Sequence, residues 1–329
     1  MDESNLEQPG PKTCTIGRAR RRSRAIHRKR ALFIGACALL LATVVSVSVH
    51  TATQARATSN AASKTTSVQQ STPPAVALSL PTSAPSAPGV AAADSINDPD
   101  LERKINDVID AYPEYQIGVA LLDVTAGGED KEVHEYGVEE PFVAASTAKV
   151  LAAEAYYHLV ETGAATLNEL LGAYPASFQL QAMIQQSDND SWSLIMDAIG
   201  FQELSEYADS LGMQYDPETN TLTPADMARI LGRLYSGSLL NAEDTTQLLS
   251  MMQNTNDETL IPAAVPGDVK VYHKYGELGG ELHDAAILDK DGHSYALVVY
   301  TRGEDLGSVA ERTDIIHKVT QVVVDVLFE

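Results

Sequence analysis

The sequence predicts an α/β domain of the α+β kind: a five-stranded antiparallel sheet flanked by terminal helices, with a mostly helical lobe inserted between strands 2 and 3. The order of the predicted elements is the main observation behind this prediction. A helix and two strands come first, a block of helices follows, and three strands and a helix complete the chain. One sheet is therefore completed by both ends of the folded region. We find no internal repeat that would indicate a solenoid.

The first predicted helix begins near Asn97, because Asp98 is a favoured N-cap residue and Pro99 is favoured in a first turn. Apolar residues then recur with helical spacing at Leu101, Ile105, Val108, Ile109 and Tyr112. Strand patterning follows at residues 116–124 and 131–136, with a glycine-containing turn at 126–128.

The next predicted helix starts at Ser146 and contains the first candidate site. Residues 147–162 are rich in Ala and free of Gly and Pro, and Gly163 provides a stop signal. Lys149 lies one turn after Ser146 on the same face. A serine at the positive end of a helix, with a lysine amine within reach, is a candidate activated nucleophile. The alternative interpretation is an ordinary helix with a serine N-cap.

The middle and the C-terminal part of the chain supply the remaining elements. Helical segments are predicted at 168–171, 178–186, 190–199, 202–211, 225–234 and 242–253. Strands are predicted at 269–275, 285–288 and 293–300, the last two as a hairpin across Lys290-Asp291-Gly292. The last helix is predicted from about Ser308.

The N-terminal region differs sharply in charge from the rest of the chain. Residues 1–30 form a basic tail with nine Lys and Arg against three Asp and Glu, which leaves 14 bases and 42 acids in the remainder, a net charge of −28. The part of the chain after residue 30 is so acidic that it would repel nucleic acid, because affinity for phosphate backbones depends on Lys and Arg. The nineteen residues 31–49 carry no charge. As a helix they would span about 28 Å, close to the hydrocarbon thickness of a bilayer.

This pattern predicts a single-pass protein of the cell membrane, with the N-terminus in the cytoplasm and the domain outside. A signal peptide cleaved near residues 53–55, which would release a secreted protein, is the alternative. Residues 50–95, rich in Ala, Ser, Thr and Pro, predict a disordered linker to the folded domain at 96–329. Cys14 and Cys37 are the only cysteines, so that domain can form no disulfide and no thiolate metal site. We expect no metal and no other cofactor, since no spacing typical of ligands or of a phosphate loop occurs.

Three short motifs occur in one order within the predicted domain. They are Ser146-Thr147-Ala148-Lys149, Ser187-Asp188-Asn189 and Lys274-Tyr275-Gly276. Each alone has an ordinary structural interpretation, as a capped helix, a turn between helices and a strand end. In this order they resemble the Ser-x-x-Lys, Ser-Asp-Asn and Lys-Thr-Gly motifs of class A β-lactamases and penicillin-binding proteins. The resemblance covers roughly residues 98–329 and implies a β-lactamase/transpeptidase-like fold.

The resemblance also implies a role for each matching residue. Ser146 would attack a carbonyl, and Lys149 would accept its proton. Ser187 would relay a proton to the departing nitrogen, and Asn189 would orient Lys149 and a substrate amide. Lys274 would supply positive charge for a substrate carboxylate. The strand end from Tyr275 through Gly276 to Glu277 would line the substrate site, with the backbone N–H groups of Ser146 and Glu277 as the oxyanion hole.

The chain departs from the family pattern at two places. Tyr275 stands where the family has a small hydroxyl residue, so a bulkier phenol would narrow the substrate channel or turn outward. The connection from Leu211 to Thr223 is also short where active class A enzymes carry a long loop with a glutamate that activates water. Asp216, in the run Asp216-Pro217-Glu218-Thr219-Asn220, is the candidate base in the position of that glutamate. A turn on an acidic surface is the other interpretation of this run.

We therefore expect an extracytoplasmic serine hydrolase or acyl-transferase whose domain is monomeric. It would form an acyl-enzyme on Ser146 with β-lactams or with D-Ala-D-Ala-type cell-wall peptides, and it would deacylate slowly because the usual base is missing. The alternative is a catalytically weak, penicillin-recognising sensor module tethered to the membrane, which Tyr275 and the missing glutamate favour.

Further polar and aromatic residues have two interpretations each. His283 and Asp284 follow the third motif and would form a histidine base with its carboxylate, or support the strand beside the site; we favour support. Trp192, Tyr156 and Tyr157 lie in predicted helices, and we expect them in the core rather than in a ligand platform.

Overall fold

The computed structural model describes residues 95–125 and 131–328. The basic tail, the apolar segment at 31–49, the linker up to residue 94 and the turn predicted at 126–128 lie outside the described residues. Within the described ranges, no helix combines the length and the apolar character needed to cross a bilayer. The membrane anchor at 31–49 therefore stays a prediction.

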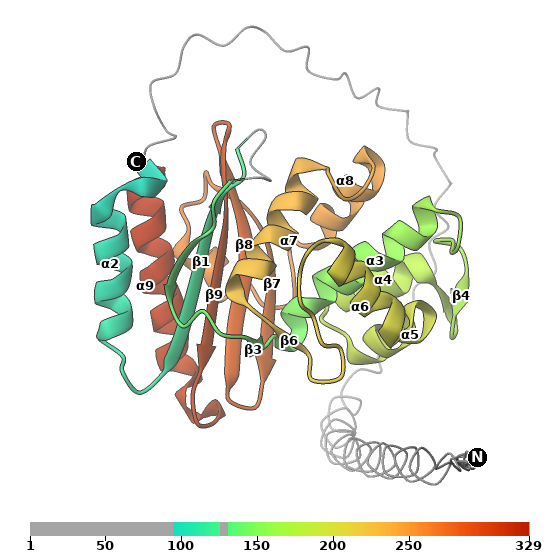
Figure 1. Cartoon of the computed structure of the whole chain (residues 1–329), viewed down its shortest axis with the longest axis horizontal. Helices are drawn as coiled ribbons and strands as arrows, with labels where there is room; N and C mark the ends of the chain where they lie inside the picture. Colours follow the sequence, from blue (N-terminus) through green and yellow to red (C-terminus); the bar gives the residue numbers. More distant parts are fainter. Residues whose placement is uncertain (1–94, 126–130, 329) are drawn as a thin grey trace, which may run out of the picture. The chain divides into compact units, whose positions relative to one another are not determined.

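A five-stranded antiparallel sheet forms the centre of the domain, in the order β2-β1-β9-β8-β7 (Figure 1). Its strands are β1 (Gln116–Asp123), β2 (His134–Gly137), β7 (Lys270–Leu278), β8 (Glu281–Lys290) and β9 (His293–Arg302). The predicted five-stranded sheet is thus confirmed, and the pairing of β1 with β9 joins the two ends of the folded region. β7, which carries the third motif, is an edge strand.

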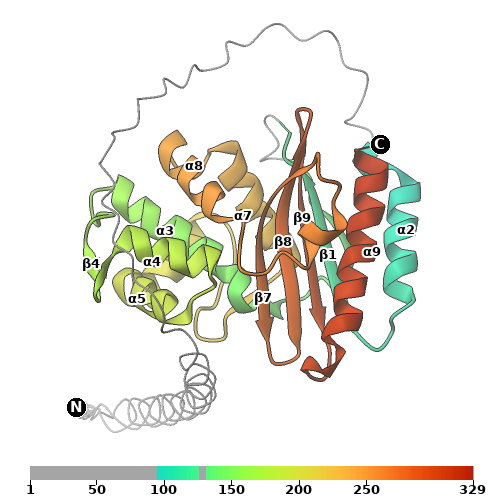
Figure 2. The ribbon, with the colours of Figure 1, turned by 180° about the vertical axis from the view of Figure 1, so that it is seen from behind.

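The terminal helices α2 (Pro99–Asp110) and α9 (Val309–Leu327) lie side by side on one face of the sheet (Figures 1 and 2). Asp98 caps α2, because its carboxylate accepts a hydrogen bond from the Asp100 N–H over 2.9 Å. The buried apolar residues of this layer include Leu101, Ile105, Ile315, Ile316 and Val319. The prediction of flanking terminal helices is therefore confirmed.

The helical lobe occupies the chain between β2 and β7 and lies beyond the opposite face of the sheet (Figure 2). Its helices are α3 (Lys149–Glu161), α4 (Ala176–Gln185), α5 (Asn189–Ile199), α6 (Phe201–Ser210), α7 (Pro224–Ser236) and α8 (Ala242–Met251). Side chains of β1 alternate between two cores: Ala120 and Leu122 pack with the lobe, while Val119 and Leu121 pack with the terminal helices. Gly232 lets α7 approach the sheet, because a Cβ there would lie 2.8 Å from Leu122 Cδ2.

Short elements complete the fold. The strand β3 (Phe142–Val143) pairs with β6 (Thr221–Leu222), and β4 (Leu170–Leu171) pairs with β5 (Tyr174–Pro175). Four described 3₁₀ segments are η1 (Ser95–Asn97), η3 (Ala145–Ala148), η4 (Ile261–Ala264) and η5 (Leu306–Ser308).

The structure corrects two predicted elements. The short helix expected at 168–171 is wrong, because these residues lead into the β4–β5 hairpin, whose turn contains Gly172 at a φ of +71°. The helix expected from Thr147 begins instead at Lys149, after the 3₁₀ turn η3. In η3 the Thr147 N–H donates to Ala144 O, three residues back, over 3.1 Å, so Ser146 lies in a 3₁₀ turn that precedes the α-helix.

Candidate active site

Ser146 lies half-buried in η3, where the turn presses against the edge strand β7. Neither η3 nor α3 has a side-chain cap, so the Ser146 hydroxyl does not serve as the N-cap considered above. Asn220 holds the turn from the other side: its side-chain N–H donates to Ala145 O over 2.9 Å, and its carbonyl accepts from Ala144 N over 2.8 Å. These bonds stabilise the left-handed backbone of Ala145 and hold the turn that contains Ser146.

Gly276 brings β7 close to the Ser146 backbone. A Cβ at Gly276 would lie 2.9 Å from Ser146 N and 3.1 Å from Ala144 O. Only glycine therefore allows this approach without a shift of the backbone. It places the Ser146 amide beside the end of β7, where Glu277 follows with an exposed side chain.

Lys149 begins α3 and is almost fully buried, with 2% of its surface exposed. Its amine donates hydrogen bonds to Ser187 O over 2.7 Å and to Asn189 Oδ1 over 2.8 Å, and it lies 3.5 Å from Ser187 Oγ. Burial lowers the pKa of Lys149 to about 8, and the charge of Asp188 opposes this only in part. A substantial fraction of the amine is therefore neutral near pH 8, as a general base must be.

Lys274 reaches the same serine from the sheet. Its side chain is fully buried, and its amine donates to Ser187 Oγ and to Tyr275 O, each over 2.9 Å. Burial, and then the charge of Lys149, hold the pKa of Lys274 well below its usual range. The two amines converge on Ser187, so the substrate-free site disfavours a proton on both. An anionic substrate group would offset this and favour the cationic form of Lys274.

Ser187 owes its position to the connection between α4 and α5. Its φ is +54°, a left-handed conformation that a non-glycine residue adopts only under local constraint. The next residue, Asp188, caps α5 by accepting from Ser191 N over 2.7 Å. The sharp turn therefore directs Ser187 towards the lysines while Asp188 starts the following helix.

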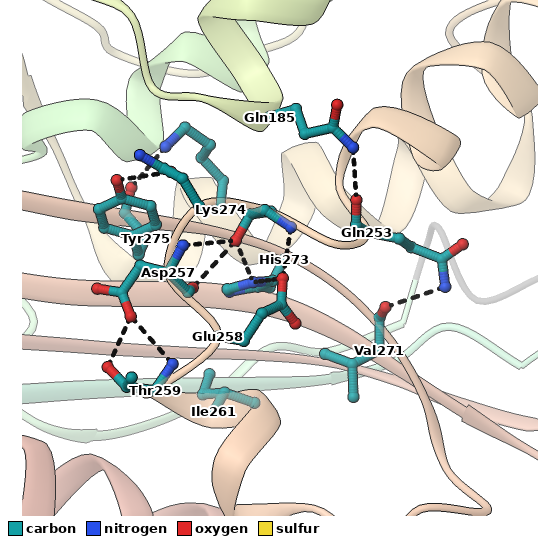
Figure 3. Close-up of polar contacts among 12 residues, drawn as sticks. Gln185, Gln253, Asp257, Glu258, Thr259, Ile261, Val271, His273, Lys274 and Tyr275 are labelled. Atoms are coloured by element: carbon teal, nitrogen blue, oxygen red, sulfur yellow. Dashed lines mark hydrogen bonds and ion pairs between the residues drawn. The ribbon is translucent and has the colours of Figure 1, made fainter. Parts of the chain in front are cut away.

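Tyr275 occupies the strand edge next to Lys274 (Figure 3). Its ring centroid lies 4.2 Å from Lys274 Nζ, a distance that permits a cation–π contact when the amine is charged. Its hydroxyl donates to Asn256 Oδ1 over 2.9 Å. The phenol is half-buried and packs partly against the core of the terminal helices. Burial raises the pKa of Tyr275, and its interactions with Ser187 and Asn256 oppose this in part. The phenol therefore contacts both the serine–lysine cluster and the segment that contains Asn256.

The side-chain hydrogen bonds of Asp216 lie within its own turn rather than in the serine–lysine cluster. Its two carboxylate oxygens accept from Glu218 N and from Thr219 Oγ1, each over 2.9 Å, and the residue is exposed. Both bonds close the local turn before β6. They support the turn interpretation of this run rather than that of a water-activating base.

His283 and Asp284 do not pair with each other as base and carboxylate. His283 accepts from Thr301 N over 3.1 Å at Nδ1 and donates to Val143 O over 2.9 Å at Nε2, which links β8 to the strand before Ser146. Asp284 instead contacts the buried His273, with 3.0 Å between Asp284 Oδ1 and His273 Nδ1. Both residues support the strands next to the site, as we favoured above.

His273 is a buried residue of this region that sequence analysis missed. Asp284 and Glu258 raise its pKa, although burial alone would lower it. In the β7–β8 register Asp284 stands opposite Tyr275, so Asp284 lies diagonally across from His273 on the same face of the sheet. The sequence alone does not give this register. The predicted core positions of Tyr156 and Tyr157 are correct, since both are fully buried, and Trp192 packs partly buried against the same core.

The cluster provides the Ser146 hydroxyl on the η3 turn and the buried amine of Lys149 three residues later. A second buried amine, that of Lys274, donates a hydrogen bond to Ser187. These groups suit acyl transfer through a serine nucleophile, in which an amine of lowered pKa accepts the proton. Within the described residues, no group of three or more His, Cys, Asp or Glu could hold a metal ion. The fold and this cluster define a serine hydrolase of the β-lactamase or DD-peptidase type.

The comparison with known proteins identifies the family. The model of the beta-lactamase enzyme family matches residues 100–327, and the chain therefore belongs to this family. A beta-lactamase of Proteus vulgaris is 27% identical over 252 residues, which cover 65% of this chain and 92% of that protein. Beta-lactamase CTX-M-8 of Citrobacter amalonaticus is 25% identical over 247 residues, 64% of this chain and 84% of that protein.

Solved structures share the fold. PBP-A superposes with a TM-score of 0.62 at 23% identity and covers 69% of this chain and 95% of its own. An ancestral class A β-lactamase superposes with a TM-score of 0.62 at 24% identity, covering 68% of this chain and 99% of its own. The expected class A β-lactamase-like architecture is thus confirmed.

Proposed function

We propose that the protein forms an acyl-enzyme on Ser146 with β-lactams or with D-Ala-D-Ala-type cell-wall peptides, and that deacylation is slow. The observation that carries this proposal is the convergence of Lys149 and Lys274 on Ser187, with Lys149 one turn from Ser146. PBP-A gives it a precedent, since a structure of one of its point mutants is an acyl-enzyme complex with penicillin G.

The proposed acylation gives every group of the cluster a role. Ser146 Oγ attacks the carbonyl carbon of the amide, and neutral Lys149 accepts its proton. The N–H groups of Ser146 and Glu277 stabilise the negative charge that develops on the carbonyl oxygen. As the carbon–nitrogen bond breaks, the proton passes from Lys149 through Ser187 to the departing nitrogen. Lys274 orients Ser187 and faces the substrate carboxylate.

Slow deacylation follows from the position of Asp216. Hydrolysis of the ester requires a water molecule activated by a base, and a positioned base contributes about 10²–10⁴-fold. Both Asp216 oxygens are bound within their own turn. The acyl-enzyme should therefore accumulate.

Intact-mass spectrometry of the full-length protein tests this proposal. With benzylpenicillin, the protein should gain the mass of one whole penicillin molecule, because the opened ring stays attached. Ser146→Ala should gain none. Equal labelling of Ser146→Ala would falsify the assignment of the nucleophile. Rapid penicillin consumption without an adduct would contradict slow deacylation.

A weak, penicillin-recognising sensor is the second candidate. Tyr275 favours it, since a phenol held by Asn256 stands where the family has a small hydroxyl residue. A sensor of this kind would bind penicillin reversibly and show no covalent adduct in the same mass measurement.

We also propose that residues 31–49 anchor the protein in the membrane with the domain outside, the basic tail at 1–30 remaining in the cytoplasm. Protease added to intact spheroplasts should then remove the domain and spare a tag placed at the N-terminus. N-terminal sequencing of the mature protein separates this topology from cleavage near residues 53–55.

A further inference from the structure

In the segment between α8 and η4, the side chain of Asn256 contacts both the helical lobe and the edge of the sheet. Gln253 in the same segment makes a second link, because its side-chain N–H donates to Val271 O of β7 over 3.3 Å. The backbone N–H of Asn256 donates to Gln185 O over 3.0 Å, and its side-chain N–H donates to Gln186 O over 3.0 Å. Its side-chain oxygen accepts from the Tyr275 hydroxyl over 2.9 Å. The exposed side-chain amide of Asn256 thus donates to the lobe and accepts from the sheet, and so bridges the two.

The two ends of this bridge are adjacent in sequence to the polar cluster. Gln186 directly precedes Ser187, and Tyr275 directly follows Lys274. Lys274 donates to Ser187 across the same junction between lobe and sheet over 2.9 Å. The left-handed φ of Ser187 makes its position depend on such external support.

Buried contacts keep the bridging segment in place, and His273 lies beside this segment in Figure 3. Thr255 Oγ1 lies 3.0 Å from His273 Nε2, and the Ile261 N–H donates to Asp284 Oδ2 over 3.0 Å. Asp284 contacts the other nitrogen of His273, so both ends of the segment are anchored to the β7–β8 pair. The Gln185 side chain adds a bond to Gln253 O over 3.0 Å. Asn256 is therefore held before any substrate arrives.

We propose that Asn256 is a positioning residue, which holds Ser187 opposite Lys274 through Gln186 and Tyr275, and that the Tyr275 hydroxyl serves this bridge rather than the substrate. The proposal rests on the acyl-transfer function proposed above. Asn256 needs no contact with the reacting atoms. It acts by keeping Ser187 within hydrogen-bond reach of the amines, and misplacement by about 1 Å can reduce a rate about 100-fold.

Penicillin acylation kinetics of the full-length protein test this role. Asn256→Ala should lower the maximal acylation rate about 10- to 100-fold and change the concentration for half-maximal rate much less, because the amide orients Ser187 without binding substrate. Asn256→Asp keeps the acceptor for Tyr275 and loses the donor to Gln186. Its maximal acylation rate should therefore lie between those of the parent and of Asn256→Ala. Asn168→Ala, at an exposed asparagine before β4, is the matched control and should behave as the parent.

A double-mutant cycle with Tyr275→Phe separates the bridge from direct substrate binding. Tyr275→Phe alone should slow acylation, and in the Asn256→Ala background its effect should be clearly smaller, since the bond to Asn256 is already gone and only the interaction with Ser187 remains to be lost. Additive effects, or a change confined to the concentration for half-maximal rate, would show that Tyr275 binds substrate and would overturn the proposal.

A crystal structure of Asn256→Ala provides a readout that needs no substrate. Ser187 Oγ and Lys274 Nζ should separate beyond hydrogen-bond distance. An unchanged separation would refute the positioning role even if penicillin acylation is observed. Conversely, absence of any penicillin adduct in the parent would refute the acyl-transfer function, while the separation measured in the crystal would still decide the role of Asn256.

Discussion

Lys274 donates a hydrogen bond to the Ser187 hydroxyl over 2.9 Å, although 87 positions separate the two residues in the chain. The bond crosses from the edge strand of the sheet to a turn of the helical lobe. Lys149 reaches the same turn from the start of α3 over 2.7 Å. The serine–lysine cluster therefore forms only where the lobe and the sheet meet, and its geometry depends on how firmly that junction is held.

The acylation rate should rise with pH as Lys149 loses its proton. Burial lowers the Lys149 pKa to about 8, and only the neutral amine can accept the Ser146 proton. The rate constant for penicillin acylation should therefore increase about tenfold per pH unit below this value and level off above it. Stopped-flow acylation between pH 6 and 10 measures this profile. A profile that is flat from pH 6 to 8 would contradict Lys149 as the base.

Gly276→Ala should slow acylation while the domain remains folded. The new methyl group would lie 2.9 Å from Ser146 N, so β7 or η3 must move and the oxyanion site would be disturbed. Loss of one such donor reduces rates about 10²–10³-fold, and we expect a decrease of that order. Gly267→Ala is the control, because a Cβ there meets no heavy atom within 4 Å. Equal acylation rates in the two variants would exclude a role for this close approach.

The order of elements and the polar cluster were predictable from the sequence for different reasons. Helical and strand periodicities are local, so they indicated the sheet, the lobe and the terminal helices. The meeting of Lys149, Ser187 and Lys274 was implied by the family resemblance, since no local pattern encodes contacts over 87 positions. Errors arose where a short turn or hairpin stands in place of an expected helix, as with the 3₁₀ turn η3 before α3.

Side-chain bridges were beyond sequence analysis because they depend on strand register and loop path. Asn256 resembles any polar loop residue until the structure places it between Gln186 and Tyr275. Glu154 is the converse case. It looks like a surface residue of an Ala-rich helix, yet it is fully buried, and neither carboxyl oxygen has a hydrogen-bond partner within the described part of the chain.

Glu154→Gln should stabilise the domain at neutral pH. Burial raises the pKa of Glu154 well above its usual range, and the charge of Arg233 only partly opposes this. The unfolded chain ionises near pH 4.3, so above that pH unfolding releases a proton. Stability then falls by about 1.4 kcal/mol per pH unit until the folded pKa is reached. Glutamine removes this loss while preserving the shape of the side chain.

Thermal unfolding at two pH values checks this expectation. Glu154→Gln should have a higher Tm than the parent at pH 7.5, about 2–4 °C for each kcal/mol gained, and nearly the same Tm at pH 4. The exposed Glu169→Gln is the control and should show no such pH-dependent difference. A lower Tm of Glu154→Gln at pH 7.5 would instead indicate that Glu154 is charged and stabilised by Arg233.

Asp216→Ala should leave the lifetime of the penicilloyl-enzyme nearly unchanged. The Asp216 carboxylate accepts from Glu218 N and Thr219 Oγ1 in its own turn, so we expect less than about a threefold effect, whereas loss of a positioned base would lengthen the lifetime about 100-fold or more. The decay of the adduct after removal of free penicillin, followed by intact mass, measures this lifetime. Asn220→Ala is the informative companion. It removes the bond to Ala145 O next to Ser146 and should slow acylation. If Asp216→Ala alone prolongs the adduct about 100-fold, the short loop carries the deacylating base after all, and the enzyme is a true β-lactamase.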